Sequence, residues 1–128
     1  MPRAKALKVR VEDKPGLLGE MAAALGDKKV NILALNAWVE GAEGVVRMVV
    51  GNVGAAKRVL AAKGWKAEDC EVLEVEIADK PGTLGAVAKA LGAAGVNIEY
   101  VFQGVAGARK ATVFMGVSDL KTAIKALR

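Results

Sequence analysis

The sequence has no histidine, one cysteine and few aromatic residues, and these shortages exclude several classes of protein. Without histidine, the chain cannot form a Ser-His or Cys-His catalytic pair or a histidine-ligated metal site. The single cysteine, Cys70, excludes an internal disulfide framework. Its neighbours Asp69 and Glu71 disfavour a reactive thiolate. We therefore expect no catalytic residues, no metal and no cofactor, and a protein that is not an enzyme.

Long apolar runs are also missing. No stretch approaches the roughly 18 consecutive apolar residues of a membrane-spanning helix, and the first residues lack the apolar segment of a signal peptide. We therefore expect a cytoplasmic protein without a membrane partner. The net charge of +5 is spread over predicted helix faces rather than along one basic stripe, which argues against a nucleic-acid partner.

One stretch of the sequence occurs twice. Residues 13–32 and 79–98 align without a gap and share 13 of 20 residues. Each copy opens with Asp-Lys-Pro-Gly and closes with Val-Asn-Ile. A repeat of this kind determines the domain organisation. We therefore predict two fused units, residues 1–70 and 71–128, each with a small core.

Each unit follows the same order of predicted elements. Residues 5–11 alternate with period two, which predicts a half-buried strand. The next apolar residues recur at helical spacing and predict an amphipathic helix with this face turned inward. They are Leu18, Met21, Ala22 and Leu25 in the first copy and Leu84, Val87, Ala88 and Leu91 in the second. Gly95 suits a left-handed helix end; Lys29 stands in its place in the first copy, so we expect that helix to end differently.

The remaining segments complete the pattern. We expect strands at residues 30–39 and 45–50 and a helix capped by Asn52. Residues 65–78 are predicted to be extended and to contain the last strand of the first unit and the first strand of the second. The sequence does not show where one of these strands ends and the other begins. The second unit repeats this with strands at 97–103 and 110–117, a turn near 104–107 and a helix from Asp119. The sequence ends where the first unit still has its final strand, so we expect this strand to be missing unless a partner or the N-terminus supplies it.

The order βαββαβ is the split βαβ arrangement. The predicted fold class is therefore α+β, with two ferredoxin-like units in tandem and antiparallel sheets that carry helices on one face.

The Asp-x-Pro-Gly-x-Leu corner after the first strand and the Val-Asn-Ile at the second strand resemble the ACT domain, a family of small regulatory modules that commonly bind amino acids. The run at residues 97–102 and the uninterrupted tandem resemble stand-alone cytoplasmic proteins with two ACT units. The resemblance covers residues 5–127. It implies an amino acid ligand held between ACT units, whose packing then changes. It also implies an unidentified metabolic enzyme as the regulated partner. Because each predicted sheet is short and partly apolar on its free side, we also expect a homodimer.

The start of a helix offers unpaired N–H groups to a ligand carboxylate. The candidate amides are those of Gly16, Leu17 and Leu18 and of Gly82, Thr83 and Leu84. Asp13 or Asp79 would bind the ammonium group. The resemblance implies that Asn31 or Asn97 of a neighbouring unit meets this corner, where its amide can donate and accept hydrogen bonds. The alternative is that these aspartates only cap the helix and that these asparagines only bond the backbone at a strand entry.

Three other functions are open at this point. The first is a structural or protein-interaction module without a ligand. The second is RNA binding, since RRM domains share this topology. The third is an acylphosphatase-like activity, because Gln103, Gly104, Val105 and Arg109 resemble a phosphate-binding loop, although the arginine lies one residue too far along.

Overall fold

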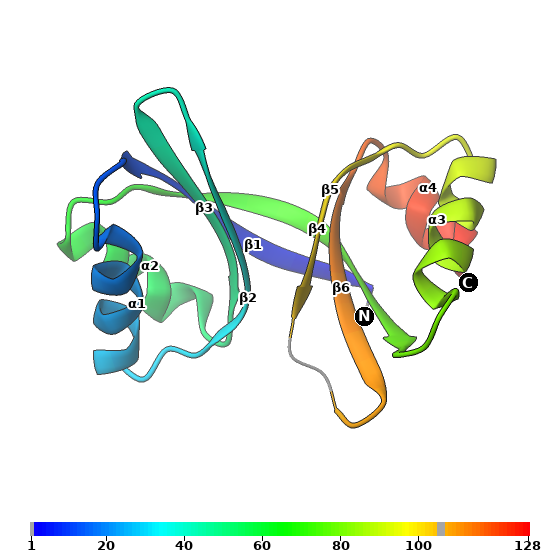
Figure 1. Cartoon of the computed structure of the whole chain (residues 1–128), viewed down its shortest axis with the longest axis horizontal. Helices are drawn as coiled ribbons and strands as arrows, with labels where there is room; N and C mark the ends of the chain where they lie inside the picture. Colours follow the sequence, from blue (N-terminus) through cyan, green and yellow to red (C-terminus); the bar gives the residue numbers. More distant parts are fainter. Residues whose placement is uncertain (1, 105–106) are drawn as a thin grey trace. The chain divides into compact units, whose positions relative to one another are not determined.

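The computed structural model describes residues 2–104 and 107–128 (Figure 1). Its elements, in chain order, are β1 (Arg3–Glu12), α1 (Leu17–Asp27), β2 (Ile32–Glu40), β3 (Glu43–Val50), α2 (Val53–Ala62), β4 (Ala67–Ala78), α3 (Thr83–Ala93), β5 (Ile98–Gly104), β6 (Lys110–Val117) and α4 (Leu120–Ala126). The chain divides into two compact units. Lys5–Cys70 is the N-terminal unit, and Glu71–Arg128, with the residues before Lys5, is the C-terminal unit.

Both units have the predicted ferredoxin-like arrangement of an antiparallel sheet with helices on one face (Figure 1). In the N-terminal unit, β3 pairs with β1 and β2, so that Leu7 and Leu35 both lie opposite Met48. In the C-terminal unit, β6 pairs with β4 and β5 in the same sense. The expected turn at 104–107 includes Val105 and Ala106, which lie outside the described residues.

The core of each unit forms between the sheet and its helices. In the N-terminal unit, Leu7, Val9 and Met48 of the sheet are fully buried against Met21 and Leu60 of the helices. The period-two pattern of β1 is therefore confirmed. The C-terminal unit buries a corresponding cluster from β4, β6, α3, α4 and the loop after α3, which consists of Leu73, Leu91, Val96, Val113, Met115 and Ala123.

The predicted inward face of α1 is confirmed for Met21 and Leu25 and wrong at its first residue, Leu18. Leu17, Met21 and Leu25 are buried, whereas Leu18 is 44% exposed. The buried residues follow at i, i+4 and i+8, so the inward face of the helix starts at Leu17. In the C-terminal unit, Leu84 is likewise 44% exposed. Both copies of the repeat thus present a leucine outward at the start of the helix.

The predicted difference between the two helix ends was also wrong. Gly95 has φ 78°, as expected, but Lys29 adopts the same left-handed conformation with φ 59°. The hydrogen bonds match as well, because Val30 N–H donates to Leu25 O at 3.0 Å and Val96 N–H donates to Leu91 O at 2.9 Å. The N-terminal unit therefore forms this helix end with a lysine in a conformation that favours glycine.

The segment between the units is one uninterrupted strand. β4 runs from Ala67 to Ala78, and the boundary between the units falls within it, after Cys70. In the C-terminal unit, Glu74 N–H donates to Pro2 O at 2.7 Å, and Arg3 pairs with Glu71 at 2.8 Å. The first residues of the chain thus lie beside β4, on the side where the predicted final strand of this unit would pair.

Among the described helices, none has the length and the apolar character that crossing a membrane would require.

Candidate functional site

The first candidate site is the N-terminal corner, residues 13–18, where β1 passes into α1. Leu17 N–H donates to Lys14 O at 3.3 Å, which closes a turn over residues 14–17. Pro15 fixes the second position of this turn and Gly16, with φ 85°, takes the third, which requires a positive φ. The sequence therefore delivers the start of α1 directly beside the end of β1.

No side chain caps the start of α1. Gly16 occupies the N-cap position, and the first helical hydrogen bond runs from Glu20 N–H to Gly16 O at 2.9 Å. The amides of Leu18 and Gly19 precede this bond and have no acceptor within the helix. These two N–H groups and the positive end of the helix dipole therefore favour an anion at this point.

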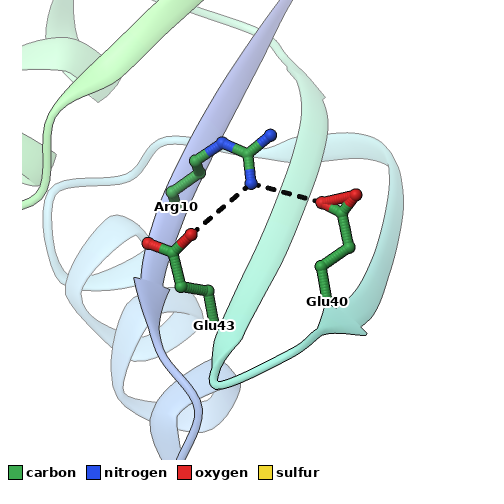
Figure 2. Close-up of polar contacts among 3 residues, drawn as sticks. All are labelled: Arg10, Glu40 and Glu43. Carbon is green, nitrogen blue, oxygen red and sulfur yellow. Dashed lines mark hydrogen bonds and ion pairs between the residues drawn. The ribbon is translucent and has the colours of Figure 1, made fainter.

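The Asp13 carboxylate does not cap the helix. Its backbone N–H donates to Ala42 O at 3.3 Å, whereas its side chain makes no hydrogen bond or ion pair with any described residue. Arg10 of β1 is paired with other acids, because its Nη1 lies 3.2 Å from Glu40 Oε2 and 3.6 Å from Glu43 Oε1 (Figure 2). This ion cluster joins β1 to the β2–β3 hairpin, and it leaves the Asp13 carboxylate available to a ligand.

A hollow of about 310 Å³ adjoins this corner. Its lining includes Asp13, Gly16, Leu17 and Leu18, the four residues of this corner that the sequence singled out. The other walls are mainly apolar and come from the ends of three strands. They include Val11, Trp38, Val39 and Val45.

Sequence reasoning did not assign Trp38 and Val39 to this hollow. The strand register explains their position, because Gly44 of β3 lies opposite both Val11 of β1 and Val39 of β2. The ends of β1 and β2 therefore lie at the same level of the sheet, on either side of β3. The sequence feature that could have placed these two residues is the length of the β2–β3 hairpin, because this length sets the strand register.

Asn31 is not part of this hollow. It precedes β2 at the far end of the sheet, roughly 20 Å of extended chain from Trp38. Its carbonyl accepts the N–H of Gly51 at 2.9 Å. Asn97 has the same place in the C-terminal unit, where its N–H donates to the Ser118 hydroxyl at 2.9 Å and its carbonyl accepts the Ser118 N–H at 3.0 Å. Within one unit, the aspartate and the asparagine are therefore apart.

The C-terminal corner, residues 79–84, has the same backbone but a different side chain at the helix start. Gly82 has φ 91° and is the N-cap of α3, again without a side-chain cap. The Thr83 hydroxyl lies 2.6 Å from Ala78 O and 3.0 Å from Lys80 O, so it donates to backbone carbonyls of the same corner. Asp79 donates its N–H to Arg109 O at 2.9 Å. Leu17 and Thr83 thus distinguish the two corners.

The phosphate-binding interpretation of residues 103–109 involves Val105, which lies outside the described residues. Gly104 ends β5 and Lys110 begins β6, so this loop joins two strands rather than a strand and a helix. An anion-binding loop normally uses amides at a helix start. The geometry of the described flanks therefore gives this interpretation no support.

Comparison with known proteins gave matches over both units. A family model described as "ACT domain" matches residues 5–63 and again residues 72–128. The structure of protein BT0572 from Bacteroides thetaiotaomicron is similar with a TM-score of 0.89 at 28% identity, over 98% of this chain and 87% of that one. The ligand-free regulatory subunit of aspartate kinase from Thermus thermophilus has a TM-score of 0.70 at 18% identity, over 99% of this chain and 89% of that one. No curated protein gives a significant sequence match.

Proposed function

Because the chain belongs to the ACT domain family, with one copy in each half, we propose that it is a regulatory protein that binds a free amino acid. ACT domains are regulatory ligand-binding domains, and one solved structure of similar fold is a regulatory subunit of aspartate kinase. By analogy, the enzyme regulated by this protein would be a separate chain. The protein itself would carry no catalytic residues.

The observation that supports this proposal most strongly is the pairing of opposite ligand-binding groups at the N-terminal corner. Asp13 supplies an unbonded carboxylate, and the start of α1 supplies uncapped amides beside it. The two charged groups of an α-amino acid are close together and need such a pair. Because Leu17 N–H already donates to Lys14 O, the amides of Leu18 and Gly19 are the ones that would bind the ligand carboxylate.

The apolar walls of the hollow favour an aliphatic side chain on the ligand. Val11, Leu17 and Val39 surround the space next to the charged groups. Charge-assisted hydrogen bonds contribute roughly 1.5–3 kcal/mol each, and immobilising the ligand costs several kcal/mol. The balance is about −4 to −8 kcal/mol, which corresponds to millimolar to micromolar binding.

The other parts of the proposal follow from the family. We propose that Asn31 or Asn97 completes the site from a neighbouring unit, in the same chain or in a second copy of a homodimer. The ligand would then change the packing between units. The proposed setting is the cytoplasm, and the proposed recipient of the signal is a metabolic enzyme.

A thermal-shift screen over the twenty amino acids tests this function. A ligand at 100 times its Kd adds about 2.7 kcal/mol to the free energy of unfolding. We expect at least one aliphatic amino acid to raise the Tm, and Asp13→Asn to abolish the shift. Asp27→Asn, which makes the same charge change at the other end of α1, should keep it. A screen without any hit would favour a structural module that binds no small ligand.

A further inference from the structure

A second hollow lies in the C-terminal unit, between α4 and the first residues of the chain. Its volume is about 380 Å³, within the usual range for small-molecule sites. The lining residues are Pro2, Arg3, Lys121, Ile124, Lys125 and Arg128. It shares no residue with the C-terminal corner, and the proposed amino acid site does not use it.

Positive charge is concentrated at this hollow. Four of its six lining residues are basic, and none is acidic. The unit has eight basic residues in all, so half of them line this one space. The hollow thus presents a strongly cationic surface in a unit whose remaining charges are mixed.

Most of these cations have no acidic partner. Arg3 is paired with Glu71 at 2.8 Å, but Lys125 and Arg128 form no ion pair with any described residue. Asp119 is the acid closest in sequence to Lys121. Its carboxylate already accepts the N–H of Thr122 at 3.0 Å and the hydroxyl of Thr122 at 2.6 Å. The charge of the hollow is therefore only partly neutralised within the unit, and Lys125 and Arg128 are the cations that remain without an ion pair among the described residues.

The spacing of the cations indicates the kind of ligand. Lys121 and Lys125 are one helical turn apart on α4, about 6 Å along its axis. Arg128 follows Leu127, the C-cap residue of α4, and its N–H donates to Lys125 O at 3.3 Å. The half-buried side chain of Ile124 lies between the lysines in the sequence and supplies an apolar part of the lining. A singly charged ion would neutralise only part of this row of charges, whereas a compact polyanion would span it.

We propose that this hollow binds a small polyanion, such as a metabolite that carries a polyphosphate chain or several carboxylates. Lys125 and Arg128 are its main ligands, and Lys121 and Arg3 contribute from either side. Because Pro2 O is hydrogen-bonded to Glu74 of β4, such a ligand would connect the first residues, β4 and α4. Binding should therefore stabilise the C-terminal unit independently of any amino acid.

Isothermal titration calorimetry of the full chain with tripolyphosphate, ATP and citrate tests the proposal. At low ionic strength, we expect saturable binding of tripolyphosphate with a Kd that rises at least tenfold in Lys125→Glu. Lys89→Glu is the matched control, because it makes the same charge change at an exposed helix position of the same unit. It should change the Kd less than twofold.

The three ligands distinguish the sources of negative charge. Binding of tripolyphosphate and ATP without citrate indicates recognition of phosphate, and binding of all three indicates recognition of charge alone. The proposal is overturned if none of the three binds saturably, or if Lys89→Glu weakens binding as much as Lys125→Glu. The amino acid screen does not depend on either outcome, since Asp13 belongs to the other unit.

Discussion

The ring of Tyr100 lies directly over the backbone of Gly116, its cross-strand partner. A methyl group on Gly116 would overlap the ring atoms, so no residue with a Cβ fits this position unless the ring moves. In the N-terminal unit, Ala34 and Val49 form the corresponding pair, and each pair follows a register shift at the start of its strand. At this place in the sheet, the N-terminal unit has the smaller residue on its second strand and the larger on its third, whereas the C-terminal unit has the larger on its second strand and glycine on its third.

Gly116→Ala should destabilise the protein by about 1–3 kcal/mol, because the added methyl group displaces a packed aromatic ring. Urea unfolding followed by circular dichroism measures this difference. Gly92→Ala is the control, since Gly92 lies within α3 and has no atoms around its Cβ position. It should stabilise the protein by about 0.5–1 kcal/mol. If both variants shifted stability in the same direction, the packing of Tyr100 against Gly116 would be contradicted.

Lys29→Gly should raise the free energy of unfolding by about 1 kcal/mol, because it relieves a left-handed conformation at φ 59°. Gly95→Lys makes the reverse change at the equivalent position and should lower the free energy by a similar amount. Chemical denaturation of the two single variants and of the double variant tests both effects. The double variant should be close to wild type, because the two helix ends lie in different units. A destabilised Lys29→Gly variant would contradict this account.

The fold could be predicted from the sequence because the repeat shows each signal twice. The cap residues Asn52 and Asp119 each accept an N–H at the start of a helix, as expected. The inward face of α1 could not be determined, because Leu17 and Leu18 are both apolar and both fit the spacing to Met21. In the second copy, Thr83 replaces Leu17, which made Leu84 appear to be the inward residue. Only the packing of the helix against the sheet decides between the two positions.

Part of the candidate site could also be predicted from the sequence. The Asp-Lys-Pro-Gly turn fixes the local geometry of Asp13 and Gly16, since these contacts are short-range. Trp38 and Val39 come to the same hollow through strand register, which depends on pairing across β3 and is not readable from either strand alone. The first residues beside β4 were one of two alternatives that the sequence left open, and only the structure chooses between them because the contact joins positions far apart in the chain.

Asp69 should make the stability of the N-terminal unit dependent on pH. The hydrogen bond from the Lys57 ammonium, together with Lys5, lowers the pKa of Asp69 against the opposing effect of desolvation. A lowered pKa in the folded state contributes stability above the ordinary aspartate value of about 3.9, and this contribution is lost as the pH falls through the folded pKa. The Tm of Asp69→Asn should therefore be below that of wild type at pH 6 and converge with it below about pH 3.

The control for this measurement is Asp27→Asn, which removes an exposed carboxylate that forms no ion pair with a described residue. Its Tm should follow that of wild type across the same pH range. A gap between Asp69→Asn and wild type that stays constant from pH 6 to pH 3 would show that the loss is not electrostatic.

The walls of the N-terminal hollow predict the selectivity of the proposed amino acid site. Burying an aliphatic side chain contributes about 1.5–3 kcal/mol, so leucine or valine should bind at least tenfold more tightly than glycine. Val39 is 58% exposed, and a change there should not disturb the core. Val39→Thr replaces one methyl group by a hydroxyl of similar size. It should weaken leucine binding about threefold to fivefold, by the free energy of roughly one methyl group, and should leave glycine binding unchanged.

Val101→Thr is the matched control, because Val101 is an exposed strand valine of the other unit and lies outside this hollow. Titration of both variants with leucine and glycine separates contact with the ligand side chain from a general loss of stability. A general loss would weaken the binding of both amino acids. If Val39→Thr lowered glycine affinity as much as leucine affinity, Val39 would not contact the ligand side chain. The charged groups near Asp13 would then be the only part of the site that the ligand reaches.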